Sequence, residues 1–237
     1  MPELRIVLVN PKFEGNVGAI ARSMSNFDVD ELYLVNPCEL GDDALRRSKH
    51  GSCILENAVI TETVEEALSG CFLIAGTSGI VTKGDRNYAR VPVPLKEFAQ
   101  QTFGYEEKIA LVFGREDTGL LQEEVNKCDV LVNIPTSETN PILNLSHAAT
   151  IAMYEMFHAG TCMRRSEPAN RMEKELMFDF FEELMDSIDY PPQRREDTAV
   201  MFRRMMGRSI PTKYEYNTIM GIFGDASKII RHGKKWE

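Results

Sequence analysis

Apolar residues occur in short runs along the first 160 positions, and amphipathic stretches with helical spacing separate these runs. Runs of this length, bounded by turn-forming residues, are typical of strands buried on both faces of a parallel sheet. The alternation predicts an α/β fold, with a parallel sheet covered by helices on both faces. The predicted strands are 4–10, 32–36, 71–78, 108–114 and 130–135, with a weaker one at 57–62. The predicted helices are 16–27, 42–50, 63–69, 94–101, 118–128 and 143–158.

The last third of the chain has a different pattern. Residues 158–170 contain Gly160 and Pro168 and are predicted to be a linker, and no strand pattern follows them. Apolar residues then recur every four positions over 170–188, which predicts an amphipathic helix. A second helix is expected over 195–209, and a third begins at Thr212, where Thr-x-x-Glu forms a capping box. We therefore predict two domains, an α/β domain at 1–160 and a helical extension at 161–237.

Charge and cysteine usage restrict the possible partners. The formal net charge is −9, and residues 1–160 carry 13 basic and 23 acidic side chains, whereas residues 161–237 carry 14 and 13. An anionic partner would therefore need local basic patches. The five cysteines and four histidines are scattered without metal-ligand spacing, so no metal is expected. The chain shows neither a signal peptide nor a run of membrane-spanning length, which predicts a cytoplasmic protein with no membrane partner.

Ligands of parallel α/β sheets bind at the carboxyl ends of the strands. Three predicted strands end there in glycine- or hydroxyl-rich loops: "GTSG" at 76–79, "FGREDTG" at 113–119 and "IPTSETNPILN" at 134–144. None carries a dinucleotide or P-loop fingerprint. Thr77 and Ser78 could donate hydrogen bonds to a ligand, although a simple turn explains each loop equally well when it is taken alone. Arg115 and Glu116 could likewise be a solvated pair.

The stretch "NPKFEGNVGAIARSM", residues 10–24, leads from the first predicted strand into a helix. Asn16 is a suitable N-cap, and the apolar residues after it recur with helical spacing. Gly18 and Arg22 lie one turn apart on a different flank. We expect Gly18 to clear space for a substrate that Arg22 contacts.

Four motifs in a fixed order carry a family resemblance. N-x-G-x-x-x-R at Asn16, Gly18 and Arg22 is followed by "GTS", then "FGRE-x-x-G", then "P-x-LNLSHA". Over about residues 4–160 this order resembles the SPOUT superfamily of RNA methyltransferases, and within it the TrmJ-type tRNA 2′-O-methyltransferases. The resemblance implies a C-terminal trefoil knot formed near residues 114–145. It also implies S-adenosylmethionine as cofactor and a homodimer in which the Arg22 helix of one subunit faces the cofactor of the other.

The resemblance also implies roles for individual residues. Arg22 and Asn16 would be catalytic. Because a guanidinium is a poor base, we expect Arg22 to act as a bidentate clamp on the target nucleotide, and Asn16 to hold the loop or the ribose. Ile142 departs from the family pattern, which commonly has serine there. The implied cofactor-binding residues are Thr77, Ser78, Gly79, Gly114, Ile134, Ile142, Leu143 and Asn144. The implied RNA-binding residues are Arg86, Arg90 and Arg115, joined by Arg203, Arg204 and Arg208 if those three are not simply a solvated helix face.

The function implied is methylation of the ribose 2′-hydroxyl at nucleotide 32 of the tRNA anticodon loop. Two alternatives stay open from the sequence. The same chemistry could act at another tRNA position or on ribosomal RNA. The chain could also be an RNA-binding protein that kept the fold and lost turnover.

Overall fold

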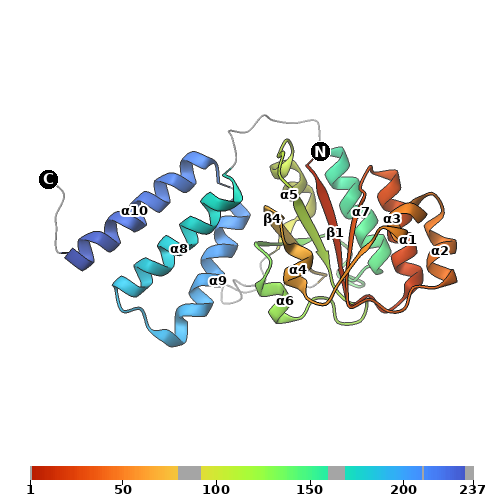
Figure 1. The fold of residues 1–237 in the computed structure, drawn as a ribbon, viewed down its shortest axis with the longest axis horizontal. Coiled ribbons are helices and arrows are strands. Elements are labelled where there is room, and N and C mark those ends of the chain that lie inside the picture. Colours follow the sequence, from red (N-terminus) through yellow and green to blue (C-terminus); the bar gives the residue numbers. More distant parts are fainter. Residues whose placement is uncertain (1, 80–91, 160–168, 210, 233–237) are drawn as a thin grey trace. The chain divides into compact units, whose positions relative to one another are not determined.

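The computed structural model describes residues 2–79, 92–159, 169–209 and 211–232 (Figure 1). These residues form two compact units, Met1–Met163 and Arg164–Glu237, and each is described by itself. None of the described helices has the length and apolar content that crossing a bilayer requires.

The first unit is built on a parallel sheet of seven strands in the order β3-β2-β1-β6-β4-β7-β5. All six predicted strands are confirmed. The seventh, β5, was missed because two residues that include a proline give no periodic signal. The strands are β1 (Leu4–Val9), β2 (Glu31–Val35), β3 (Val59–Thr61), β4 (Leu73–Thr77), β5 (Val93–Pro94), β6 (Ile109–Phe113) and β7 (Val130–Asn133).

Helices cover both faces of this sheet, as predicted. Val7 and Val9 join an apolar cluster with residues of α4 (Val64–Leu68) and α6 (Gln122–Asn126) on one face. Because side chains alternate along a strand, the fully buried Ile6 and Leu8 point to the opposite face. That face is covered by α1 (Glu14–Asn26), α5 (Leu95–Thr102) and α7 (Leu145–His158), and α7 packs against the other two (Figure 1).

The start of α1 differs from the prediction. The helix begins at Glu14 rather than Asn16, and its N-cap, Phe13, makes no side-chain capping bond. Asn16 therefore lies within the first turn, where its side chain is available for contacts with other elements.

Close packing on α1 also corrects the role expected for Gly18. The helix contacts α2 (Asp42–Ser48), the 3₁₀ turn η1 (Lys49–Gly51) and α3 (Ser52–Glu56), the last of which the sequence did not predict. A Cβ on Gly18 would lie 2.1 Å from the carbonyl oxygen of Ala44, and one on Gly51 would lie 2.2 Å from that of Ala21. Gly18 thus admits the backbone of α2 and does not clear space for a substrate.

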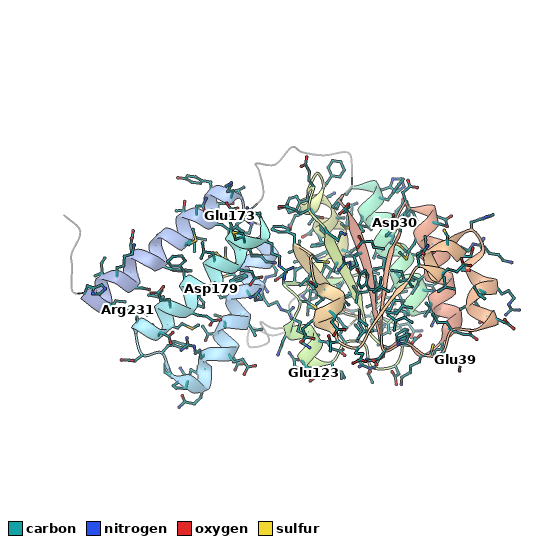
Figure 2. The ribbon with its side chains drawn as sticks, in the orientation of Figure 1. Asp30, Glu39, Glu123, Glu173, Asp179 and Arg231 are labelled. Atoms are coloured by element: carbon teal, nitrogen blue, oxygen red, sulfur yellow. The ribbon has the colours of Figure 1, made fainter. Side chains whose placement is uncertain are left out.

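The second unit contains three helices, α8 (Arg171–Ser187), α9 (Pro192–Ser209) and α10 (Lys213–His232). Their shared core includes Phe178, Phe202 and Tyr216. Thr212 and Glu215 form the predicted capping contacts at the start of α10, with Glu215 N donating to Thr212 Oγ1 at 3.3 Å. The start of α8 is also capped, by a capping box of Asn170 and Glu173. Figure 2 shows Glu173 at this end of α8 and Arg231 near the end of α10.

Candidate active site

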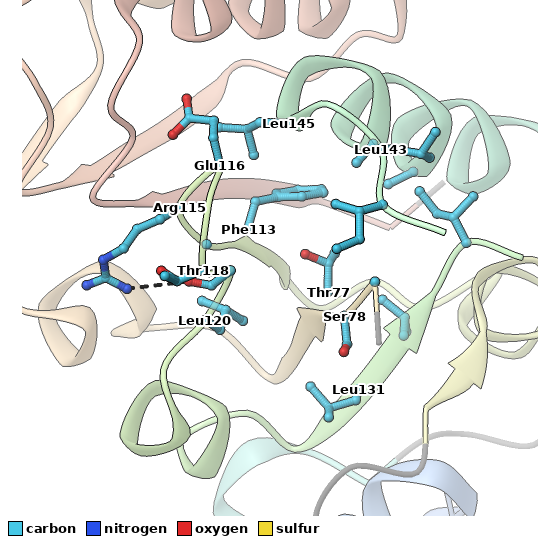
Figure 3. A pocket seen from close by; sticks show the side chains of 18 of the residues that line it. Thr77, Ser78, Phe113, Arg115, Glu116, Thr118, Leu120, Leu131, Leu143 and Leu145 are labelled. Atoms are coloured by element: carbon cyan, nitrogen blue, oxygen red, sulfur yellow. Dashed lines mark hydrogen bonds between the residues drawn. The ribbon is translucent and has the colours of Figure 1, made fainter. Parts of the chain in front are cut away.

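A pocket opens at the carboxyl ends of β4, β6 and β7, where the sequence predicted a ligand site (Figure 3). Its walls combine backbone from the loops after these strands with apolar side chains from the sheet and from α5, α6 and α7. Seven of the eight predicted cofactor residues line it: Thr77, Ser78, Gly79, Gly114, Ile134, Ile142 and Leu143. The pocket lies within the first unit, and its lining comes from three chain segments that are far apart in the sequence.

The loop after β6 is folded tightly back on itself. Arg115 and Gly119 form an antiparallel bridge, with Gly119 N donating to Arg115 O at 2.9 Å. A Cβ on Gly114 would lie 2.1 Å from the carbonyl carbon of Gly119, which itself has φ of +67°. Both glycines of "FGREDTG" are therefore required by the loop itself, in addition to the place of Gly114 in the pocket wall.

Arg115 does not present a free guanidinium to RNA, in contrast to the expectation from the sequence. Its two terminal nitrogens each donate to a carboxylate oxygen of Glu124 at 3.0 Å. The side chains of Arg115 and Glu124 are only 16% and 7% exposed, and Glu124 also accepts the backbone N–H of Leu121 at 2.7 Å. A partly buried bidentate pair of this kind ties the loop to the start of α6.

Glu116, the next residue, occupies the N-terminal end of α1. Its carboxylate accepts the backbone N–H of Lys12 at 2.9 Å and the Nδ2–H of Asn16 at 2.9 Å. It also accepts the backbone N–H of Phe13 at 3.3 Å, so it serves the first helix as a cap supplied by another element. The neighbouring Asp117 adds an ion pair with Lys12, which lowers the pKa of the Asp117 carboxyl through the hydrogen bond.

Asn144 links the fourth motif to the first. Its Oδ1 accepts the backbone N–H of Ser146 at 2.9 Å, which confirms Asn144 as the predicted N-cap of α7. Its Nδ2 donates to Asn16 Oδ1 at 3.2 Å. Among the predicted cofactor residues, Asn144 is the one outside the described lining of the pocket. Its observed contacts make it a residue that positions the loop and Asn16.

Arg22 lies two turns further along α1 from the Glu116–Asn16 contact. Its side chain is exposed, and it makes no hydrogen bond or ion pair with any described residue. An arginine without such partners at the surface is able to bind an anionic group of a substrate. Asn16, by contrast, already uses its amide oxygen and one amide hydrogen within the protein, so the structure favours its role in holding the loops.

The remaining arginines predicted to contact RNA lie in two places, in the segment 86–90 and on α9. Arg86 and Arg90 lie outside the described residues. Arg203 on α9 pairs with Glu175 at 3.3 Å, and its guanidinium carbon lies 4.1 Å from the ring centroid of Phe178. Arg203 is thus tied to α8, which leaves the expected basic face of α9 less available than the sequence implied.

Two lining residues have contacts that refine their roles. The Thr77 hydroxyl donates to the carbonyl of Val112 at 3.0 Å, so its hydrogen is already engaged and only its oxygen lone pairs can serve a ligand. Ile142 is 63% exposed, and a Cβ on Gly79 would lie 3.5 Å from Ile142 Cγ1. Gly79 and Ile142 therefore face each other from two loops of the pocket.

The charge of the pocket indicates which ligands it suits. Among the described residues that line it, Arg115 is the only cationic side chain, and Glu124 neutralises it. Glu116 and Asp117 also lie in the lining. Burial raises the pKa of the nearby Cys38 thiol, and the Glu116 and Glu14 carboxylates raise it further. A pocket with this charge suits a ligand that carries positive charge and an apolar body better than a nucleotide phosphate.

Sequence reasoning missed the role of Glu116. Its partners lie 100 to 104 residues away in the chain, and no spacing or periodicity relates them. The only sequence signal was its place inside "FGREDTG", where a solvated pair with Arg115 was an equally good interpretation. Within the described residues there is no group of three side chains suited to hold a metal ion.

Comparison with known proteins agrees with this fold. The model of the SpoU rRNA Methylase family matches residues 3–154, which include β1, the pocket loops and most of α7. The molecule is thus an RNA methyltransferase by class. The chain belongs to the SpoU rRNA methylase family.

The relatives extend over both units. A tRNA (cytidine-2′-O-)-methyltransferase TrmJ of Methanocaldococcus jannaschii is 38% identical over 93% of this chain and 98% of its own. A tRNA (cytidine/uridine/adenosine-2′-O-)-methyltransferase TrmJ of Pseudomonas aeruginosa is 34% identical over 98% of this chain and 96% of its own. The solved structure of a probable methylase family protein from Haemophilus influenzae has a TM-score of 0.67 and 28% identity, covering 98% of this chain and 99% of that one.

Proposed function

We propose that this chain methylates the ribose 2′-hydroxyl of tRNA at nucleotide 32 of the anticodon loop, with S-adenosylmethionine as methyl donor. The observation that carries the proposal is the convergence of Asn16, Glu116 and Asn144, one from each of three motifs, beside the pocket. The names of the relatives from Methanocaldococcus jannaschii and Pseudomonas aeruginosa support tRNA as the substrate. A tRNA substrate in turn supports a cytoplasmic location.

The residues of the pocket fit the proposed cofactor. Leu95, Leu131 and Leu143 give an apolar wall for a purine, and backbone groups of 77–79 and 114 provide polar edges for it. The Glu116 carboxylate in the wall of the pocket suits a ligand that bears sulfonium and ammonium charges. When bound, S-adenosylmethionine supplies an electrophilic methyl group. Because that donor is strong, the protein mainly has to place the ribose oxygen correctly, and alignment of this kind contributes up to about 7–11 kcal/mol.

Arg22 is assigned the contact with the target nucleotide. A guanidinium has five N–H donors and no acceptor, so Arg22 does not remove the 2′-hydroxyl proton. It instead donates two hydrogen bonds to a phosphate or to the developing alkoxide, which fixes the nucleotide and stabilises negative charge. Asn16 acts as a positioning residue, because its amide connects the loops of Glu116 and Asn144 to the helix that carries Arg22.

A homodimer is part of this proposal. Phe27, Tyr154, Phe157 and His158 form a cluster of ring contacts at the ends of α1 and α7. Tyr154 and Phe157 are 48% and 42% exposed in the single chain, and a second copy would cover them. Pairing through α1 and α7 would bring Arg22 of one subunit towards the cofactor of the other. The trefoil knot is likewise proposed from the family resemblance, and the position of β4 between β6 and β7 is compatible with it.

The division of labour between the two units also belongs to the proposal. Residues 1–160 would carry out the methyl transfer, and residues 161–237 would contribute to tRNA recognition. One observation keeps a second function open: Ile142 brings no hydroxyl to the position where the family commonly has serine. A change of target within tRNA or ribosomal RNA, or loss of turnover with RNA binding kept, would each be consistent with it.

The test is methyl transfer from labelled S-adenosylmethionine to bulk unmodified tRNA, followed by nuclease mapping of the labelled nucleotide. A 2′-O-methyl group at nucleotide 32 supports the proposal in full. Label at another nucleotide keeps the chemistry and corrects the target. Bound cofactor without label in tRNA or ribosomal RNA contradicts the enzymatic proposal and favours the binding protein.

A further inference from the structure

The region around Arg22 carries a second group of cations, on α2 and η1. The sequence "LRRSKH" at 45–50 places Arg46, Arg47, Lys49 and His50 on the surface, and all four are exposed. Residues 42–50 contain two aspartates and three Arg or Lys side chains, so this stretch has a net positive charge within a domain that is strongly acidic. We call Arg22, Arg46, Arg47, Lys49 and His50 together the basic ridge.

Glycines hold the basic ridge rigidly against the helix of Arg22. Gly15 and Arg22 are seven residues apart and therefore lie on the same face of α1, two turns from each other. The Nε of Arg47 lies 2.8 Å from the place that a Cβ on Gly15 would occupy. A Cβ on Gly51 would lie 2.8 Å from the backbone nitrogen of Arg22. The elements that carry the ridge thus pack along α1, and Gly51 at the end of η1 lies beside the backbone of Arg22.

Lys49 has a backbone conformation that few lysines adopt. Its φ is +49° and its ψ is −115°, in a region that glycine enters freely and other residues enter only at a cost. The side chains of Lys49 and His50 make no hydrogen bond or ion pair with any described residue. A strained, exposed cation without such partners is better explained by a ligand than by stability of the fold.

Asp43 accepts hydrogen bonds from both arginines of α2. Arg47 Nε donates to Asp43 Oδ2 at 2.8 Å, and Arg46 donates to Asp43 Oδ1. These hydrogen bonds lower the pKa of the Asp43 carboxyl, Arg46 being the larger cause. Exposed pairs on a helix contribute little to stability, so the arginines can exchange Asp43 for a stronger anion.

From these contacts we infer that the basic ridge binds the phosphate backbone of the RNA substrate next to the nucleotide held by Arg22. This inference rests on the proposed function for the identity of the RNA. It gives an acidic protein a local surface that an RNA strand can approach, and α2 and η1, which carry most of this surface, pack against the helix of Arg22. The ridge binds phosphates and so contributes affinity and register without reading bases.

The experiment compares direct binding of unmodified tRNA over a series of salt concentrations for four proteins. They are the wild type, the double variant Arg47→Gln/Lys49→Gln, the control double variant Lys96→Gln/Lys127→Gln, and Asp43→Asn. Both double variants remove two positive charges from the first unit, so a general effect of net charge would appear in both. Circular dichroism and thermal unfolding check that each variant is folded.

The double variant Arg47→Gln/Lys49→Gln, the ridge variant, loses two phosphate contacts. Its plot of log K for tRNA binding against log[salt] should therefore be flatter than that of the wild type by about 1.5. The control should leave the slope within error of the wild type. Asp43→Asn should tighten binding several-fold, because it frees Arg46 and Arg47. Equal slopes in the two double variants, or weaker binding by Asp43→Asn, would overturn the inference.

These outcomes are separable from those of the methyl-transfer test. A protein that transfers no methyl group but shows the expected slopes would refute the proposed function and keep the basic ridge as an RNA-binding surface. A protein that methylates tRNA with the ridge variant unchanged in affinity would keep the function and refute the ridge. The inference about the ridge would also be refuted if Arg47→Gln/Lys49→Gln changed the salt dependence of binding to a purified protein but not to tRNA.

Discussion

Asn16 and Glu116 are joined by a hydrogen bond of 2.9 Å, although 100 residues of chain separate them. The bond connects the first turn of α1 to the loop after β6, and the same carboxylate caps α1 through the backbone N–H groups of Lys12 and Phe13. One carboxylate therefore sets both the start of the Arg22 helix and one wall of the pocket. The position of α1, which carries Arg22, relative to the loop after β6 depends on Glu116.

Replacing Glu116 by alanine should weaken both stability and activity. The change leaves N–H groups at the start of α1 without their acceptor and releases Asn16, at a cost of about 1–2 kcal/mol in unfolding free energy. Methyl transfer should fall by more than this stability loss explains, because Arg22 is no longer held in register. Denaturant unfolding and single-turnover kinetics measure the two effects. Glu106→Ala, an exposed glutamate outside the site, is the control and should change neither.

Replacing Arg22 by lysine tests the proposed clamp. Lysine keeps the positive charge but cannot donate two parallel hydrogen bonds, so kcat should fall by roughly 10²–10³, with the fold and cofactor affinity unchanged. Rates at saturating tRNA and cofactor measure the effect, and calorimetry with S-adenosylmethionine checks the pocket. Near-normal turnover of Arg22→Lys would contradict the bidentate contact.

Ile142 should contribute to cofactor binding through its apolar surface. The side chain is 63% exposed at the pocket and can lose water-accessible area when a ligand enters. Ile142→Ser should weaken S-adenosylmethionine binding by about 15- to 60-fold, in line with the burial of two or three methyl or methylene groups, and change stability little. Ile142→Val, which removes one methylene, should lie in between. Unchanged affinity in both variants would place the cofactor away from Ile142.

The glycine contacts beside α1 should be intolerant of any side chain. Gly18→Ala sets a Cβ against the Ala44 carbonyl oxygen at 2.1 Å, so α2 has to move, at a cost of about 1–3 kcal/mol. Gly221→Ala on α10 is the matched control, since nothing lies within 4 Å of the added Cβ. It should stabilise the chain by up to about 1 kcal/mol through higher helix propensity. Equilibrium unfolding of the two variants should therefore give shifts of opposite sign.

Glu31 should make stability depend on pH at the other end of the sheet. Burial raises the pKa of its carboxyl, but hydrogen bonds from Lys108 and Arg5 outweigh this, and the net effect lowers the pKa below its usual value. The Nε of Arg5 lies 2.8 Å from Glu31 Oε2. A lowered pKa in the folded state stabilises the protein above pH 4.5, and this contribution is lost as the pH falls through the folded-state value.

Glu31→Gln should therefore destabilise the protein near neutral pH by about 1 kcal/mol, and the difference from the wild type should vanish in acid. Unfolding midpoints measured from pH 7 down to the acid limit of the fold give the comparison. A difference that stays constant over the whole range would show that the carboxyl charge has no part in the effect.

Local sequence patterns were enough to predict six of the seven strands, most of the helices and the loops of the pocket. The apolar runs of β1, β6 and β7 report burial on two faces, and a local pattern is enough to detect this. The capping residues Asn144 and Thr212 were also predicted, because a cap bonds to backbone two or three residues away. The four motifs were sufficient to indicate the family, since their order along the chain requires no knowledge of contacts.

Tertiary structure alone decided what several motif residues do. Arg115 pairs with Glu124, Gly18 packs on Ala44, and Asn16 bonds to Glu116 and Asn144. The basic ridge likewise arises only when α2 and η1 pack on α1. Hydrogen bonds and close packing act over a few ångströms in space, and the partners of Asn16 lie 100 and 128 residues away in the chain. Periodicity shows that a side chain is buried or exposed, but only the fold shows which distant side chain it meets.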